Sequence, residues 1–426
     1  MLRTVIPVLL SAAIAAALQA AVASELPSPL TLDAAIAAAR ERNPDIRAAE
    51  ARYLAMRERP IQEGTLPDPM LGVRYHNEDW KPTFGESDFS YFEVSAEQEI
   101  PFPGKLGLRS RIAEREAERE RAMRDMSVLM ALANVAVSYA DLAVAERSAE
   151  ILRENTRLLT LMIEQTASRY SVGEAAQQDV LRATLERGGL EERLTMLARE
   201  RKAAAAALAA LLDLDNAAML PATTALPEPP PLELLETLRG KLAAGSPPLR
   251  AAAEELLRTQ EALRLARREY YPDFALMGAY TNKQDLLPEW ELGVRMSVPL
   301  YFWRRQRAGV AEASFAARAA EHARRNTQVS LEARLADLYA MAESAQRLLR
   351  LYDETLIPQA TLTLESARAS YGVGRVDFLS TLTAFSALLE YRLRRAEETG
   401  SLWRALAEIG PLVGETPFGE PLRSSP

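Results

Sequence analysis

Few residue types that carry enzymatic or metal chemistry occur in this chain. It has 426 residues with two histidines, His76 and His322, and no cysteine. The histidines stand alone, one on a predicted strand and one on a predicted helix, without the spacing of metal ligands. The stretch YGVGRVDF, from Tyr371, contains Gly-x-Gly. It lacks a third glycine and follows a helix, unlike a dinucleotide-binding loop. We therefore predict no enzyme, no cofactor and no metal site.

Glutamate and arginine side chains recur on two predicted β-strands. Apart from Gln98, the segment from Phe92 to Ile100 alternates apolar with polar residues, and so does the segment from Trp290 to Leu300. This period of two predicts a sheet with one apolar and one polar face. The polar members that we select as pore-lining candidates are Glu93, Glu97, Glu99, Glu291 and Arg295. The glutamates either favour cations in a pore or are ordinary solvated residues, and the sequence leaves both interpretations open.

Each of these strands has a predicted hairpin partner, Met70 to Asn77 or Phe274 to Asn282. Strands of roughly 9 to 12 residues are long enough to cross a bilayer when tilted. Four strands cannot close a barrel, and open sheet edges cannot face lipid, so a membrane sheet requires several chains. Two chains give an eight-stranded barrel filled by side chains, whereas three give about twelve strands and a pore. A soluble β-subdomain packed on a helix is the alternative.

The elements that position these residues occur twice. Four segments match in the same order, among them LPDPMLGVRYHN from Leu66 and YPDFALMGAYTN from Tyr271. The turns SRYSVG and ASYGVG place Tyr170 and Tyr371 201 positions apart, close to half of the chain. We predict a tandem duplication in which each copy contains a helix, a β-hairpin and a long helical hairpin.

The predicted boundaries follow from this duplication. The segments are a signal peptide, 1–23; a first repeat, 24–222, with its hairpin at 66–101; a Pro-rich linker, 223–231; a second repeat, 232–414, with its hairpin at 271–300; and a C-terminal tail, 415–426, expected to be disordered. The short apolar run after Arg3 and the small residues Ala21 and Ala23 indicate a secretory signal rather than a retained anchor. No other uninterrupted apolar stretch is long enough to span a bilayer as a helix.

Long helices dominate both copies. The expected helices are 32–59, 104–166, 232–268 and 305–370. From Leu331 to Leu356 and from Val128 to Leu142, apolar residues alternate steps of four and three, which is typical of coiled coils. Pro358 should kink the second long helix. At 1.5 Å per residue, about 60 residues make a helix of roughly 90 Å, a length that favours an extended coiled coil over a compact bundle.

The charge distribution argues against nucleic-acid binding. The formal net charge is −8, and charged residues are interspersed along the helix-like segments. No basic block stands out of the kind that contacts phosphates. We predict no nucleic-acid partner.

Taken together, these segments resemble the outer-membrane efflux proteins, the TolC-like channels. The resemblance covers about Leu30 to Gly414 and rests on the duplication, on LTLDAAIAAARERNPDIRAAEA, on VPLYFWRRQRAGVAEA and on LIPQATLTLESARASYGVG. It implies a mainly α fold with a small β part, in which a homotrimer builds a 12-stranded outer-membrane barrel and a periplasmic helical tunnel. Members act as exit ducts of tripartite pumps, with a periplasmic adaptor and an inner-membrane transporter as partners.

The resemblance also assigns roles to the two turns. Adaptor contacts would be made by Tyr170, Val172, Gly173, Tyr371, Val373 and Gly374. The periplasmic gate would be formed by Asp179, Tyr371, Arg375 and Asp377. The interval from Gly374 to Asp377 is three residues shorter than that from Gly173 to Asp179, and the expected second acid falls on Ser380. A weak latch of exposed ion pairs suits a gate, but Asp179 is equally explained as a helix cap.

One further segment bears on the cargo of the channel. QEIPFPGKLGLRSRIAEREAERERA, from Gln98, resembles the heavy-metal efflux (CzcC-like) branch, which implies a duct for metal cations and an RND-type transporter. Export of drugs or other small molecules is the alternative. A periplasmic coiled-coil scaffold, with strands packed on protein, is a further one.

Overall fold

The computed structural model describes residues 26–77, 80, 90–283 and 287–420. Contacts divide the chain into two units. The first unit contains the residues up to Arg47, Ser127–Lys241 and the residues from Arg334 onward. The second unit contains Ala48–Met126 and Leu242–Ala333. The signal peptide predicted at 1–23 lies outside the described residues.

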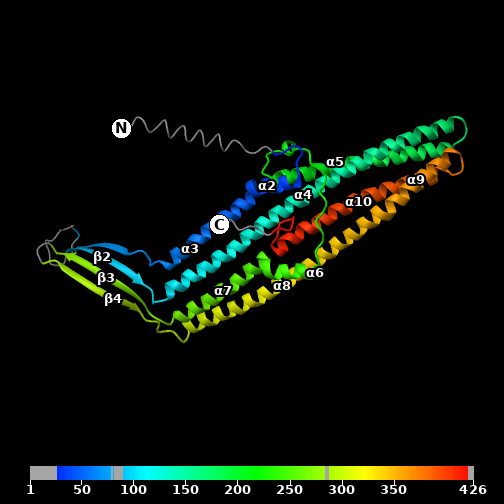
Figure 1. Ribbon diagram of the computed structural model, residues 1–426. Coiled ribbons are helices and arrows are strands. Elements are labelled where there is room, and N and C mark those ends of the chain that lie inside the picture. Colours follow the sequence, from blue (N-terminus) through cyan, green and yellow to red (C-terminus); the bar gives the residue numbers. More distant parts are fainter. Residues whose placement is uncertain (1–25, 78–79, 81–89, 284–286, 421–426) are drawn as a thin grey trace. The chain divides into compact units, whose positions relative to one another are not determined.

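The second unit contains a four-stranded antiparallel sheet in the order β1-β2-β3-β4 (Figure 1). The strands are β1, Met70–His76; β2, Tyr91–Ile100; β3, Asp273–Asn282; and β4, Glu289–Ser297. The β1–β2 and β3–β4 pairs are the two predicted hairpins, and β2 pairs with β3, so that one sheet joins both copies of the duplication.

The fourth strand is shorter than we predicted. We expected it to run to Leu300, but it ends at Ser297. Pro299 has no N–H to donate to a ladder, and the amide of Leu300 instead donates to the carbonyl of Val298 in a turn (2.9 Å).

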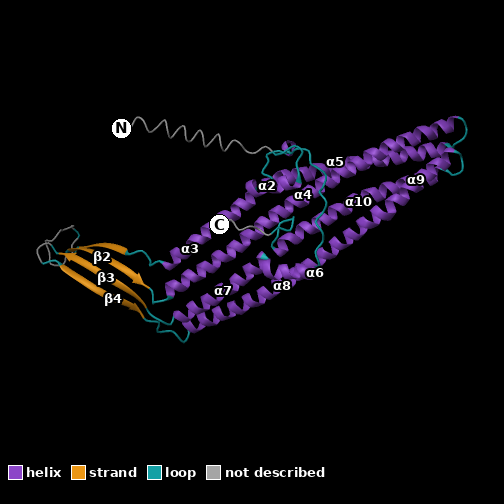
Figure 2. Cartoon of the chain, viewed as in Figure 1, coloured by secondary structure: helices purple, strands orange, loops and turns teal. Residues whose placement is uncertain are grey.

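Four helices adjoin the strands: α3, Pro44–Gly64; α4, Lys105–Ser171; α7, Pro247–Arg268; and α8, Arg305–Leu351. The later parts of α4 and α8 belong to the first unit. Within the second unit, ion pairs connect neighbouring helices. Arg59 of α3 pairs with Glu116 of α4 at 2.7 Å. Arg115 of α4 pairs with Glu254 of α7 at 3.1 Å. Figure 2 shows these long helices continuing from the loops that end the strands.

The first helix of each copy is divided, which the sequence analysis did not predict. Instead of one helix over 32–59, α2 (Leu32–Arg42) ends before α3, and instead of one over 232–268, α6 (Leu235–Gly245) ends before α7. Pro44 and Pro247 begin the following helices, because proline is favoured at the first helical position, where its missing N–H leaves no helical hydrogen bond unmade. Asn43 Oδ1 also accepts the amides of Asp45 and Ile46, at 2.9 and 3.2 Å.

The first unit is helical and has its own buried clusters. It contains α5, Gln177–Leu211; the short turn η1, Ala217–Met219; the π-helical turn η2, Tyr352–Leu356; α9, Ile357–Gly372; and α10, Phe378–Val413. One cluster combines α4 residues such as Leu159 with Leu190 of α5, Leu364 of α9 and Phe385 of α10. These contacts bring the two helical hairpins of the duplication together.

The coiled-coil pattern predicts burial correctly in this unit. Leu132, Val135 and Tyr139 of α4 are buried, as are Leu335 and Leu338 of α8. Next to Pro358, the helix is interrupted by the π-helical turn η2, which separates α8 from α9. The long helix is therefore interrupted next to Pro358 by a widened turn, while the kink that we expected there stays a prediction.

The Pro-rich linker and part of the tail pack on the first unit. Leu30 forms a bridge with Thr223, and the Tyr139 hydroxyl donates to carbonyl oxygens of Leu30 and Thr224, which lie 2.9 and 3.0 Å away. The predicted disorder of the tail is wrong for residues 415–420. Phe418 packs against the core cluster that contains Trp403, whose ring it meets edge-on at 6.4 Å, so apolar packing holds this part of the tail. Residues 421–426 lie outside the described chain.

Candidate functional site

The two Tyr-x-Val-Gly turns have the same backbone structure. Gly173 and Gly374 adopt positive φ angles of 81° and 71°. In the first tip the amide of Gly173 donates to Tyr170 (3.0 Å) and that of Glu174 to Arg169 (2.9 Å). In the second, Gly374 donates to Tyr371 (3.0 Å) and Arg375 to Ser370 (2.9 Å). Each tip is a Schellman motif, whose left-handed residue glycine adopts without a Cβ penalty.

The two tips are also equal in length, which corrects the shorter second tip that we expected. Ala176 is the N-cap of α5 and Asp377 the N-cap of α10, each three residues beyond its glycine. Asp377 therefore corresponds to Ala176, and Asp179 corresponds to Ser380. The expected difference arose because Asp179 and Asp377 are both acidic but occupy different positions of the turn.

Only the second tip has a side-chain cap. Asp377 Oδ1 accepts the backbone amide of Ser380 at 3.1 Å and also the Ser380 hydroxyl. These hydrogen bonds lower the pKa of the Asp377 carboxyl, and the positive charge of Arg182 on α5 adds to the effect. Asp179 lies in the first turn of α5 and is not its cap. The capping explanation that we gave for Asp179 thus applies to Asp377.

Tyr371 is held inside the first unit rather than exposed as a latch. Its side chain is buried, and its hydroxyl donates to Thr166 Oγ1 at 3.4 Å. The Arg169 guanidinium lies 4.8 Å from the centre of the Tyr371 ring and donates to the Tyr371 carbonyl. Phe378 meets the ring edge-on at 5.5 Å. Arg169 was missed in the sequence, where its only signal is its place directly before the first tip's tyrosine.

The other gate candidates do not meet Tyr371 within one chain. Arg375 is exposed, and among the described residues its side chain has no ion pair. Asp179 is half-buried and likewise has no ion pair in the described part of the chain. The described chain thus shows no latch between Asp179 and Arg375.

The adaptor-contact candidates divide into exposed side chains and turn-forming glycines. Tyr170, Val172 and Val373 are exposed at the tips, although two are apolar and one is aromatic. Gly173 and Gly374 shape the turns. Tyr371, at 8% exposure, offers little surface to a partner.

The five pore-lining candidates share one face of the sheet, as the pairing register shows. Glu97 is opposite Met277, which is opposite Gly293, so the alternate residues Glu93, Glu99, Glu291 and Arg295 lie on the same side. Arg295 Nη1 donates to Glu97 Oε1 at 2.8 Å. Arg74 of β1, which the sequence analysis did not select, pairs with Glu93 at 3.3 Å. The face is therefore acidic but partly neutralised.

The opposite face is an apolar surface apart from Gln98, which lies between Ala96 and Ile100 on β2. Leu71 pairs with Ala96, Val94 with Tyr280, and Tyr280 with Trp290, which places apolar side chains of all four strands together. The exposed members are Leu71, Val73, Tyr75, Phe92, Val94, Ile100, Leu276, Tyr280, Trp290, Leu292, Val294 and Met296. Beyond the end of β4, a groove of about 800 Å³ is lined by Tyr270, Pro272 and the exposed Leu300–Trp303 segment. Aromatic residues at the border of an apolar band are typical of membrane barrels.

Metal-binding geometry is absent from the described residues. No group of three or more His, Cys, Asp or Glu side chains there is placed to hold a metal ion. His76 instead stacks on Tyr91, with ring centres 5.1 Å apart.

These features agree with known proteins. A family model described as Outer membrane efflux protein matches residues 35–213 and 238–415. The chain belongs to the outer membrane efflux protein family. The two matched ranges correspond to the two copies of the duplication. The periplasmic scaffold considered from the sequence is thereby excluded, because members of this family are channels of the outer membrane with a periplasmic helical tunnel.

Individual relatives are distant but cover nearly the whole chain. The cobalt-zinc-cadmium resistance protein CzcC of Cupriavidus metallidurans is 24% identical over 400 residues, 92% of this chain and 91% of that protein. The outer-membrane channel OprN matches with a TM-score of 0.79 at 19% identity, covering 91% of this chain and 90% of its own. CusC matches with a TM-score of 0.78 at 16% identity, covering 90% and 92%. The TolC-like fold is thus confirmed.

Helix α4 also meets the length and composition test for a membrane span. Most of its apolar window is buried inside the fold. Because the family's channels cross the membrane through strands, we attribute this window to the helical core.

Proposed function

We propose that this outer-membrane efflux channel is a passive trimeric exit duct of a tripartite pump. The observation that carries the proposal is the sheet, which exposes a predominantly apolar face on one side and a charged face on the other. One chain leaves β1 and β4 as open edges, and such edges cannot face lipid. Three chains would close them into a barrel of about twelve strands, wide enough for a pore.

The tips suit contact with a periplasmic adaptor. Tyr170, Val172 and Val373 are exposed at the turns without burial in their own chain. Asp179, Arg375 and Asp377 are charged and accessible near the same turns, where ion pairs between subunits would form a weak gate. Exposed ion pairs contribute about 0–1 kcal/mol each, so adaptor binding would displace several at little cost. An adaptor and a transporter are the partners proposed here because the family works within tripartite pumps, and the RND type of the transporter is proposed from the similarity to the heavy-metal efflux branch.

Heavy-metal cations are the proposed cargo. The similarity to a cobalt-zinc-cadmium resistance protein supports this choice, and the acidic residues Glu93, Glu97, Glu99 and Glu291 would favour cations in the barrel. A passive duct requires no metal-binding cluster. Drugs or other small molecules are the alternative cargo.

Conductance in planar lipid bilayers tests the duct. Purified wild-type trimers should form cation-selective pores. Arg295→Gln frees Glu97 from its ion pair, so the cation-to-anion permeability ratio from reversal potentials should rise by about twofold. Glu291→Gln removes a negative charge from the same face and should lower that ratio. Trimers that carry no current, even with Asp179 and Arg375 substituted to open the gate, would contradict the proposal.

The cargo is tested separately by growth of a deletion strain. The strain is compared with wild type on copper, silver, zinc, cobalt, nickel and cadmium salts, and on dyes, detergents and antibiotics. Sensitivity confined to metals supports cation efflux. Sensitivity to hydrophobic drugs alone assigns the channel to a multidrug pump instead.

A further inference from the structure

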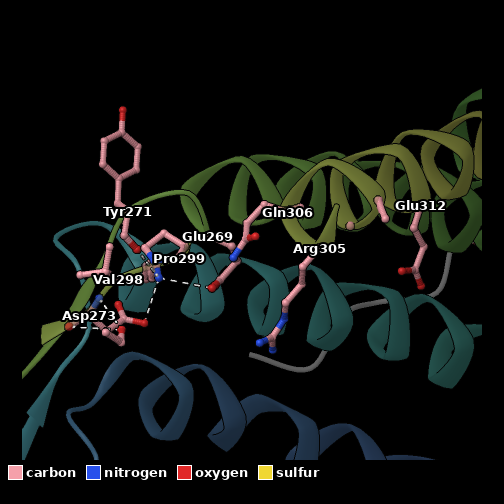
Figure 3. A pocket seen from close by; sticks show the side chains of 13 residues that line it. Glu269, Tyr271, Asp273, Val298, Pro299, Arg305, Gln306 and Glu312 are labelled. Atoms are coloured by element: carbon pink, nitrogen blue, oxygen red, sulfur yellow. Dashed lines mark hydrogen bonds and ion pairs between the residues drawn. The ribbon is translucent and has the colours of Figure 1, made fainter. Parts of the chain in front are cut away.

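A polar pocket lies where the strands of the second unit meet its helices (Figure 3). Its volume is about 720 Å³. The lining includes the start of α4, the end of α7, both ends of the β3–β4 hairpin and the first turns of α8. Figure 3 shows Arg305 and Glu312 extending from α8, with Glu312 farther along the helix from the residues around Asp273. The channel function described above uses none of these residues.

Lys105 is the centre of that cluster. Its side chain is only 1% exposed. The ammonium group donates to Asp273 Oδ2 at 2.9 Å, to the Tyr271 carbonyl at 3.1 Å and to Glu269 Oε2 at 3.3 Å. All three donor positions of the lysine are therefore used.

Further contacts make this a joint between the two copies. The Phe102 amide donates to Asp273 Oδ1 at 2.7 Å, and the rings of Phe102 and Tyr271 stack at 4.5 Å. Phe102 and Lys105 follow β2 of the first copy, whereas Tyr271 precedes β3 of the second copy and Asp273 is the first residue of that strand. The joint fixes the end of one hairpin to the beginning of the next.

The duplication defines the equivalent positions at the other end of the sheet. In the first hairpin Met70 is opposite Glu97, and in the second Ala275 is opposite Arg295. The two hairpins therefore share one register when β1 is aligned with β3 and β2 with β4. In this alignment Asp68 corresponds to Asp273, just as LPD matches YPD in the sequence.

The first residues of α4 and α8 identify the residue of the second copy that is equivalent to Lys105. Leu108 donates to the Gly104 carbonyl at 3.1 Å at the start of α4, and Ala308 donates to the Arg304 carbonyl at 3.0 Å at the start of α8. Lys105 and Arg305 are the first residues of these helices. Arg305 thus occupies, after β4, the place that Lys105 occupies after β2.

Within one chain this second joint is incomplete. Asp68 and Arg305 are exposed, and among the described residues neither side chain forms an ion pair or hydrogen bond. They lie at opposite edges of the sheet, Asp68 before β1 and Arg305 after β4. Next to Arg305, Gln306 Oε1 is buried without a hydrogen-bond donor in the described chain.

We propose that Arg305 pairs with Asp68 of the neighbouring subunit and so repeats the Lys105–Asp273 joint between chains. The proposal rests on the trimer proposed above. In the proposed trimer, β4 of one subunit lies next to β1 of its neighbour. If these two strands pair as β2 and β3 pair within one chain, Met296 is opposite the partner subunit's Leu71, and Val294 is opposite the partner subunit's Val73. Both pairs join apolar residues of the same sheet face, as continuity of the lipid-facing surface requires.

The first copy has a lysine and the second an arginine at this position, and the number of acidic side chains at the equivalent partner positions explains the difference. Lys105 has two carboxylates, of Glu269 and Asp273, whereas the residue that corresponds to Glu269 is Gly64. Among the positions equivalent to the partners of Lys105, only Asp68 supplies a carboxylate for Arg305. A guanidinium group can satisfy one carboxylate with two parallel hydrogen bonds, which an ammonium group cannot.

Disulfide cross-linking tests the register, and the absence of natural cysteine makes the test clean. Val73→Cys combined with Val294→Cys should give disulfide-linked trimers on non-reducing gels. Leu71→Cys with Leu292→Cys lies on the same face but about 13 Å out of register, and should not cross-link. Ala96→Cys with Gly278→Cys, directly opposite each other within the chain, should form an internal disulfide without linking subunits.

Charge reversal tests the ion pair itself. Each exposed pair changes an equilibrium constant by a factor of about 2 to 5, so Arg305→Asp, which removes three pairs, should increase trimer dissociation by roughly tenfold or more. Adding Asp68→Arg to the same chain should restore the trimer. Arg304→Asp, one residue away, is the control and should have a smaller effect.

The outcomes separate this joint from the trimer on which it rests. A wild-type chain that remains monomeric in lipid would overturn both proposals. Wild-type trimers in which the internal disulfide forms, but the Val73–Val294 pair does not cross-link, would overturn the joint alone. Failure of Asp68→Arg to rescue Arg305→Asp would do the same.

Discussion

The two copies of the duplication share their backbone turns but differ in the surroundings of the same side chains. Tyr170 and Tyr371 occupy equivalent positions in identical Schellman motifs, yet Tyr170 is 47% exposed and Tyr371 only 8%. Lys105 and Arg305 begin equivalent helices, but only Lys105 has acidic partners in its own chain. Duplication thus preserved the geometry of each element, and the neighbours decided which copy became part of the core and which remained a surface.

Alanine substitution of the two tyrosines should give the largest difference in local stability between the two copies. Tyr371→Ala should lower the local opening free energy of the second tip by about 3 kcal/mol, because a buried aromatic ring and its contacts with Arg169 and Phe378 are lost. Tyr170→Ala should change that of the first tip by less than about 0.5 kcal/mol. Hydrogen exchange of tip amides in the intact protein measures both values. Equal effects would mean that the two tips are not distinguished by burial.

Lys105→Met should have the next largest effect. The substitution leaves Glu269 and Asp273 without their cation and should destabilise the start of β3 by about 2 kcal/mol, below the cost for a fully buried pair because both carboxylates are partly exposed. The measurement is hydrogen exchange of the β3 amides. Lys283→Met, which breaks the exposed pair with Glu289 on the same sheet, is the control and should cost about 0.5 kcal/mol.

The turn glycines should behave alike in both copies. Gly173→Ala and Gly374→Ala should each reduce tip stability by about 1 kcal/mol, because both residues have positive φ. Added Cβ atoms would meet no close neighbour, so backbone strain is the main cost. A difference larger than about 1 kcal/mol between the two variants in hydrogen exchange would show that the turns are not equivalent.

Changes to the two helix caps should give the smallest difference in local stability between the copies, and this difference should depend on pH. At pH 7, Asp377→Ala should speed exchange in the first turn of α10 by about fivefold, and Ala176→Asp should slow it in α5. The folded-state pKa of Asp377 is lowered, so its stabilisation is complete above its ordinary pKa, near pH 4. It is lost as the pH falls through the lowered value. Exchange corrected for its intrinsic pH dependence should show no Asp377→Ala effect in strong acid.

Much of the fold followed from local patterns. Alternation along the strands predicted both hairpins and the two-faced sheet, and steps of three and four predicted the buried face that includes Leu132 and Leu338. Divided helices were missed because Pro44 and Pro247 lie within otherwise continuous helical patterns. The packed tail was missed because its polar and Pro-rich composition does not show that Phe418 meets Trp403.

The candidate site was predicted in kind but not in its contacts. The pore-lining residues share one face, as alternation required, but Arg74 and the pairing of Arg295 with Glu97 depend on which strands are neighbours. The gate candidates were chosen by type and position along the chain. They do not meet in one chain because Tyr371 is buried against Thr166 and Arg169.

The sequence by itself determined the features that one segment decides alone. These include the glycine turns, since only residues without a Cβ adopt positive φ freely, and the alternation of the strands, since side chains of a strand point to opposite faces. Only the tertiary structure decided that Tyr371 and Lys105 are buried and that Arg295 pairs with Glu97. Burial and pairing require neighbours from distant segments, and two copies with nearly the same local sequence acquire different neighbours.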